Sequence, residues 1–265
     1  MSVAGLLLGD SRFPAGGHAH SGSVEAAVTA GTVSDLRTLE VFLRGRLRTA
    51  GLVAAAIAAS VCARARQGTQ DTGSVLVGER GNGARGESAA PVRDDYWTLL
   101  DGEVDARTPA PAQREASRRQ GRALLRAARV AWPDAPWLAE LAASAGTGGA
   151  GLGGGTRREY RGGPHHAVVL GAAAAAAGCE AQEAARIAAY QAVAGPVSAA
   201  VRLLALDPMR ATGVLSRLAG DIELIASQGA GYADGPACDL PCPSAPALDL
   251  LAETHMRAEV RLFES

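Results

Sequence analysis

Apolar positions recur at three- and four-residue intervals along most of the chain, which is the period of an α-helix. The segment 34–50 is a clear case, because its large apolar side chains fall on one helical face. They are Leu36, Leu39, Phe42, Leu43 and Leu47. Ser34 is expected to cap this helix, with Asp35 in its first turn. The next segment, 52–65, is apolar nearly all round, which predicts a buried helix.

Further helices are predicted by the same period. They cover 92–106, 110–131, 133–146, 162–178, 180–207 and 207–228. A last helix followed by a short tail is predicted within 247–265. Pro111 and Pro208 suit first turns, and Asp207 suits an N-cap. Gly195-Pro196 predicts a kink. The pattern predicts an all-α fold, with one compact domain of about ten helices over residues 1–265.

Two glycine-rich stretches, 68–90 and 146–163, interrupt the helical pattern and are expected to be flexible loops. Residues 74–78 alone have the composition of a strand. The many alanines and glycines on the predicted helices allow close approach of helix axes. Flat faces of this kind suit packing inside the domain or against a partner.

Composition argues against several classes of binding partner. The formal net charge is −1, and every basic residue is arginine, so the overall field does not favour nucleic acid. Aromatic residues make up 4% of the chain, which gives little stacking surface for a nucleotide or flavin. Neither a secretory signal nor a membrane-spanning run is recognised. A cytoplasmic protein that binds neither nucleic acid nor membrane is expected.

The motifs of common catalytic sites are missing. A phosphate-binding P-loop requires a lysine, and a nucleophile elbow requires G-x-S-x-G; the chain has neither. Cys238 and Cys242 could be half of a zinc site, but reduced surface thiols are the favoured interpretation. His18 and His20 could bind a metal together with a distant carboxylate. The alternative is that His20 and Ser21 cap a helix or a turn, and no stable metal site is expected.

Four blocks of sequence, in one order, resemble the urease accessory proteins of the F type. The first block is "GDSRFPAGGHAHSGSVEAAV", which matches the family's N-terminal signature. Its matching residues are Asp10, Ser11, Pro14, Gly16, Gly17, His20, Ser21 and Glu25. The second block carries a D and an R-E-A-S-x-x-x-G pattern, through Asp101, Arg114, Glu115, Ala116, Ser117 and Gly121. The third is 189–218, and the last is "HMRAEVRLFES" at 255–265.

The resemblance implies an all-α homodimer without enzymatic activity of its own. It also implies a bridge between two partners, the D-type (or H-type) accessory protein and the G-type GTPase. The complex would deliver nickel to apo-urease, and a role in regulating GTP hydrolysis by the G-type partner has been proposed for the family. Nickel would be handled by the complex, with no cofactor bound stably to this chain.

The C-terminal helix and tail are expected to bind the D-type partner, because arginine and aromatic side chains dominate interface energies. The residues concerned are His255, Arg257, Arg261, Leu262, Phe263 and Ser265. For Phe263 the alternative is packing on the protein's own core. Arg186 and Tyr190 lie four residues apart on one helical face and could serve the dimer or the G-type partner. The alternative is a solvated arginine over a core tyrosine.

Three hypotheses remain open from sequence: a non-enzymatic assembly factor, a metal-dependent hydrolase using His18 and His20, and an all-α regulatory module with another partner. The stretch 9–22 is expected to form a corner between a short first helix and a helix entered at about His18. Asp10, Ser11, His20 and Ser21 would fix that corner, and Gly16 and Gly17 would give it the backbone freedom it needs.

Overall fold

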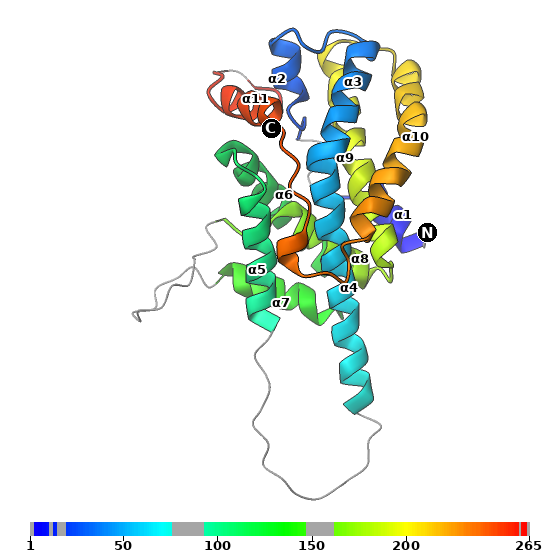
Figure 1. Ribbon diagram of the computed structural model, residues 1–265, viewed down its shortest axis with the longest axis vertical. Coiled ribbons are helices and arrows are strands. Elements are labelled where there is room, and N and C mark those ends of the chain that lie inside the picture. Colours follow the sequence, from blue (N-terminus) through cyan, green and yellow to red (C-terminus); the bar gives the residue numbers. More distant parts are fainter. Residues whose placement is uncertain are drawn as a thin grey trace, which may run out of the picture.

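The computed structural model describes residues 3–10, 13–14, 20–75, 93–146, 162–259 and 261–263. In these ranges the regular elements are helices, which confirms the all-α prediction (Figure 1). The first half contains α1 (Val3–Gly9), α2 (Val24–Thr29), α3 (Leu36–Arg46), η2 (Leu47–Gly51), α4 (Leu52–Val75), α5 (Arg93–Ala106) and α6 (Pro111–Ala131). The second half contains α7 (Pro136–Gly146), α8 (His166–Ala176), α9 (Ala181–Leu203), α10 (Pro208–Ala230), η3 (Ala237–Asp239) and α11 (Pro246–Met256).

Helix α3 continues through one π-helical turn, η2, into α4, and the three form the long helix in the middle of Figure 1. Its part Leu36–Gln67 is long and apolar enough to cross a membrane, despite its arginines and glycines. However, 61% of its most apolar stretch is buried inside the fold. Helices α8, α9 and α10 pack around α4, so this is the packing of a core helix.

Small residues bring these helices close together, as the composition suggests. A Cβ atom on Gly171 of α8 would lie 2.5 Å from the carbonyl oxygen of Ala58 in α4. A Cβ on Gly229 of α10 would lie 2.7 Å from the Cβ of Ala55. Neither position has room for a side chain, so glycine is required for these two helix contacts.

The helix starts follow capping rules. Asp207 accepts a hydrogen bond from the Met209 N–H at 2.8 Å, and Pro111 stands in the first turn of α6, both as predicted. The prediction for α3 is wrong by one residue. Asp35, not Ser34, is the N-cap, because its carboxylate accepts the Thr38 N–H at 2.7 Å and completes a capping box.

Pro196 lies inside α9, which continues past it to Leu203. A proline has no N–H, so the carbonyl of Ala192, four residues earlier, loses its helical partner. Arg46 replaces it, because its Nε donates to the Ala192 oxygen at 3.0 Å. The end of α3 is therefore joined to the middle of α9.

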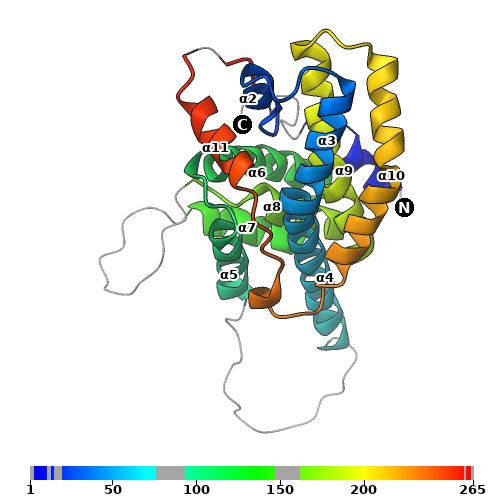
Figure 2. The same ribbon diagram turned by 45° about the horizontal axis from the view of Figure 1, so that its top comes forward.

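Helices α5, α6 and α7 pack against α8. Helix α11 packs against α2 and α6 (Figure 2). Helix α4 extends to Val75, into the range 68–90 for which a loop is expected. The remainder of that range and most of 146–163 lie outside the described residues. The predicted last helix is present as α11, but it ends at Met256, so the tail that follows it is longer than the short tail predicted.

The N-terminal corner also differs from its prediction. The short first helix is present as α1, but α2 begins at Val24 and not near His18. Gly22 and Ser23 precede it with φ values of 58° and 70°, in the left-handed region that turns the chain. Neither His20 nor Ser21 caps α2, whose N-cap is Ser23.

Candidate functional site

The two ends of the chain meet in a buried cluster, here called the tail anchor, formed by Glu25, His255, Leu262 and Phe263. The Glu25 carboxylate lies 2.9 Å from His255 Nε2. It also accepts the backbone N–H groups of Leu262 and Phe263, at 2.8 and 2.9 Å. A carboxylate with these three donors is well satisfied although it is buried. The tail anchor fixes the path of the chain after α11.

The residues predicted to bind the D-type partner fall into two groups, those buried in the tail anchor and those exposed. His255 and Phe263 are buried, and the guanidinium of Arg202 lies 5.6 Å from the Phe263 ring centre. Phe263 therefore packs on the protein's own core, the alternative considered from sequence. Arg257, Arg261 and Leu262 are exposed, Leu262 by 73%. Ser265 lies outside the described residues.

A second buried polar cluster, here called the α8 cap, joins α5 and α6 to the start of α8. Asp101 accepts the His165 N–H at 2.8 Å, and Ser117 Oγ accepts the His166 N–H at 3.2 Å. These bonds satisfy amide groups at the N-terminus of α8 from other helices. Arg118 donates to both Asp101 and Asp105, at 2.6 and 2.8 Å.

A glycine is also required where α6 meets the segment before α8. A Cβ on Gly121 of α6 would lie 2.1 Å from the carbonyl oxygen of Pro164. Gly121 and Ser117 come from the R-E-A-S-x-x-x-G block, so this block is where α6 meets the segment before α8. No local pattern in the sequence indicates that Asp105, Arg118 and His165 belong to one cluster, because their contacts span long sequence separations.

The α8 cap includes a possible metal site. Among the described residues, Asp101, Asp105 and His165 offer three ligand atoms within 4.8 Å of one another. Arg118 already supplies a positive charge to both carboxylates. Burial raises the pKa of Asp101, whereas the hydrogen bond from His165 lowers the pKa of Asp105. A metal ion would have to displace the guanidinium, so the arrangement is explained as an ion-pair cluster.

Ser117, His165 and Asp105 also form a hydrogen-bonded chain of the residue types used by serine hydrolases. His165 Nδ1 lies 3.0 Å from Ser117 Oγ, and Nε2 lies 3.0 Å from Asp105 Oδ1. His165 has no exposed surface, and Ser117 is engaged with the backbone of α8. These hydrogen bonds hold the side chains of Ser117, His165 and Asp105 in place, so their role in the α8 cap is structural.

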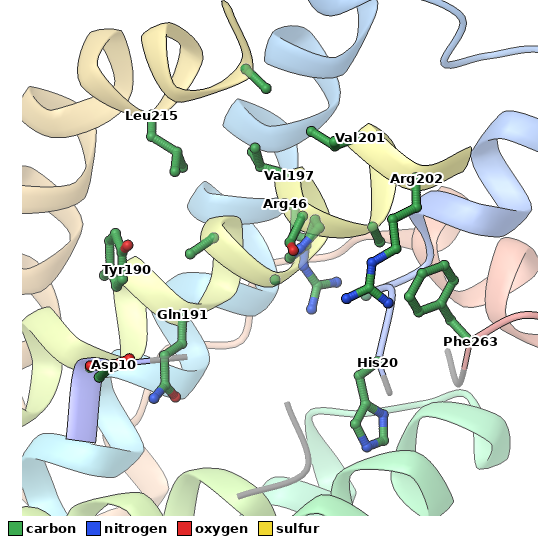
Figure 3. A pocket seen from close by; sticks show the side chains of 18 of the residues that line it. Asp10, His20, Arg46, Tyr190, Gln191, Val197, Val201, Arg202, Leu215 and Phe263 are labelled. Carbon is green, nitrogen blue, oxygen red and sulfur yellow. The ribbon is translucent and has the colours of Figure 1, made fainter. Parts of the chain in front are cut away.

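A cavity of about 540 Å³ lies between α9, the end of α3 and the residues around His20 (Figure 3). Arg46, Arg202 and His20 lie at one end of it, and Asp10, Tyr190 and Gln191 at the other (Figure 3). The N-terminal motif thus reaches two places: Asp10 and His20 line the cavity, and Glu25 belongs to the tail anchor. Ser21 is fully buried and Pro14 is exposed.

Some predicted motif residues lie outside the described part of the chain. They are Ser11, Gly16, Gly17 and His18. The pairing of His18 with His20 in a metal site therefore stays a prediction. Within the described residues, His20 does not belong to the group of three close metal-ligand side chains.

Arg186 and Tyr190 lie one turn apart on α9. Arg186 Nε donates to the two oxygens of Glu223 in α10, at 2.8 and 3.0 Å. Tyr190 is 39% exposed. The two side chains are accessible on one surface, with the arginine already held by α10.

The four cysteines fall into two classes. Cys62 and Cys179 are buried, and burial raises the pKa of the Cys62 thiol to about 12. Cys238 and Cys242 are exposed and free. Neither of the exposed pair belongs to a group of three potential metal ligands among the described residues.

Comparison with known proteins identifies the family. The sequence profile of the UreF family matches residues 33–219. The Urease accessory protein UreF of Mycobacterium tuberculosis (strain ATCC 25618 / H37Rv) is 40% identical over 261 residues, which are 98% of this chain and 97% of that protein. Those of Mycobacterium marinum and Mycolicibacterium vanbaalenii are 40% and 38% identical over 260 residues, with the same coverage. The chain therefore belongs to the UreF family of urease accessory proteins.

Proposed function

We propose that this chain is a non-enzymatic scaffold in urease maturation. It bridges the D/H-type accessory protein and the G-type GTPase in the cytoplasmic complex that delivers nickel to apo-urease. The observation that carries the proposal is the similarity to urease accessory proteins along nearly the whole chain. Nickel is the cargo of the complex, and this chain binds no cofactor stably. Regulation of the GTPase is a further part of the proposed role.

The surface proposed for the D/H-type partner is the exposed part of the tail. The tail anchor holds the backbone of Leu262 and Phe263 against Glu25. Leu262 and the neighbouring Arg261 then project from a fixed backbone, which limits the entropy lost on binding. An apolar side chain beside an arginine is a combination typical of interfaces. In this arrangement His255 and Phe263 position the surface and do not contact the partner.

The surface proposed for the homodimer is the outer side of α9, around Arg186 and Tyr190. Glu223 holds the arginine in place, and the tyrosine offers a partly exposed ring. Leu6 and Leu7 on the neighbouring helix α1 are 54% and 46% exposed. Preorganised arginine and aromatic groups beside apolar side chains are suited to an interface.

Co-purification tests the proposal. The tagged chain is expressed with its own D/H-type and G-type partners, and the captured proteins are identified by mass spectrometry. Wild type should capture both. Leu262→Asp should lose the D/H-type protein, whereas Val130→Asp should retain it. Val130 is a matched control, since it is an apolar residue on α6 with 83% exposure. Capture of neither partner by the wild type would refute the scaffold.

A further inference from the structure

The cavity in Figure 3 has a basic end, where two arginines form no ion pair with a described carboxylate. Its volume of about 540 Å³ is in the range of small-molecule sites. Arg46 comes from the end of α3 and Arg202 from the end of α9. Figure 3 shows the two guanidinium groups pointing into the same space, with the ring of His20 below them. Three nitrogen-bearing side chains thus converge from separate parts of the chain.

Arg46 is held firmly by a neutral backbone group. Its Nε donates to the Ala192 carbonyl at 3.0 Å, which fixes the guanidinium plane. Gly22 leaves space for it, because a Cβ there would lie 3.0 Å from Cζ and Nη2 of Arg46. Within the described residues, no carboxylate forms an ion pair with Arg46. Burial lowers the pKa of Arg46 to about 10, so it is still charged at neutral pH.

Arg202 is also held by an uncharged group. Its guanidinium stacks over the Phe263 ring, at 5.6 Å from the ring centre. A stacked guanidinium keeps its N–H groups free in its own plane. No described carboxylate forms an ion pair with Arg202. The tail anchor therefore positions Arg202 at the cavity through Phe263.

Several other arginines of the protein that are partly or largely buried have carboxylate partners. Arg118 is paired with Asp101 and Asp105, Arg107 with Glu103, and Arg186 with Glu223. A charge that is partly removed from water without a partner is costly. Asp10 lines the same cavity but lies at the opposite end, beside Tyr190 and Gln191 (Figure 3). The basic end therefore has N–H donors that an anion could use.

We propose that the basic end of this cavity, formed by Arg46, Arg202 and His20, binds the oxyanion of a small molecule. Guanidinium groups bind phosphate and carboxylate oxygens through paired, charge-assisted hydrogen bonds. Two guanidinium groups that face one space can share one such anion. The ligand class is a small phosphate- or carboxylate-bearing molecule, and this inference is independent of the scaffold role.

Calorimetric titration of the full-length protein tests the proposal. The probes are inorganic phosphate and acetate, each at an ionic strength held constant with chloride. At least one should bind, and Arg46→Gln and Arg202→Gln should each weaken it by about tenfold or more. Arg129→Gln is the control, since Arg129 is exposed on α6, away from the cavity. It should bind as the wild type does.

The two probes separate the ligand classes. Phosphate binding alone would assign the site to phosphate-bearing ligands, and acetate binding alone to carboxylates. Arg202 is exposed, so Arg202→Gln should fold even if Arg46→Gln does not, which circular dichroism would check. The proposal is overturned if neither anion binds at millimolar concentration, or if Arg202→Gln binds as tightly as Arg129→Gln.

Discussion

Glu25 and His255 are 230 residues apart in sequence, yet the carboxylate of one lies 2.9 Å from the imidazole of the other. The same carboxylate accepts two backbone N–H groups of the tail. The N-terminal signature and the C-terminal close of the chain are therefore parts of one structure. Together they hold the tail against α2.

Replacing Glu25 by alanine should release the tail. Buried donors left without an acceptor each cost about 1–3 kcal/mol, so the free energy of unfolding should fall by at least about 2 kcal/mol. Chemical denaturation measures this, and limited proteolysis should show earlier cleavage after α11. Glu115→Ala is the control, because Glu115 forms an exposed pair with Arg119 and should change stability by less than about 0.5 kcal/mol. Equal effects of the two substitutions would contradict the tail anchor.

The two glycines Gly121 and Gly102 should respond oppositely to alanine. At Gly121 the new Cβ would meet the Pro164 carbonyl at 2.1 Å, and overpacking should cost about 1–3 kcal/mol or more. At Gly102, inside α5, a Cβ meets nothing within 4 Å, so the higher helix propensity of alanine should stabilise by up to about 1 kcal/mol. Thermal denaturation of both variants decides this. A stabilised Gly121→Ala variant would show that α6 and α8 do not approach as described.

The stability of the protein should depend on pH through His166. Burial, and then repulsion from His20, lowers the pKa of His166 from 6.5 to about 4. Between these values the unfolded chain binds a proton that the folded chain does not, so stability falls as the pH falls. The full shift corresponds to about 3 kcal/mol.

The difference between wild type and His166→Gln isolates this effect from other titrating groups. Denaturation curves at pH 7 and pH 4.5 should show a smaller loss of stability for the variant. Parallel losses in the two proteins would mean that His166 titrates alike in the folded and unfolded states.

Thiol labelling should separate the cysteines by burial. In the native protein, Cys238 and Cys242 should react with a thiol reagent, and Cys62 and Cys179 should not. The raised pKa of Cys62 keeps its thiol protonated and slow to react. After unfolding, all four should react. Rapid modification of Cys62 in the native state would be inconsistent with its place in the core.

Local patterns in the sequence could predict much of the fold. Helical periodicity located the main helices, and proline and aspartate marked the starts of α6 and α10. The end of α11 could not be predicted, because the chain leaves the helix to reach Glu25, which is distant in sequence. The choice between Ser34 and Asp35 as N-cap depends on which side chain meets Thr38, and that is decided by backbone geometry.

The candidate site was predictable only in part. Motif resemblance pointed to His20, Glu25 and His255, but not to what they contact. Arg46 and Arg202 lie on helical segments where an arginine ordinarily indicates a solvated face. Their convergence on one cavity depends on the packing of α3 against α9 and on the carbonyl that Pro196 frees. Contacts of this kind arise from tertiary structure and leave no local signal.

The measurement that tests the scaffold role most directly is the composition of the complex formed by purified components. The D/H-type protein and the G-type GTPase are mixed with and without this chain, and each mixture is examined by size-exclusion chromatography with light scattering. The scaffold role predicts one species that contains both partners when this chain is present, and separate elution when it is absent. Co-elution of the two partners without this chain, or no joint species with it, would contradict the account.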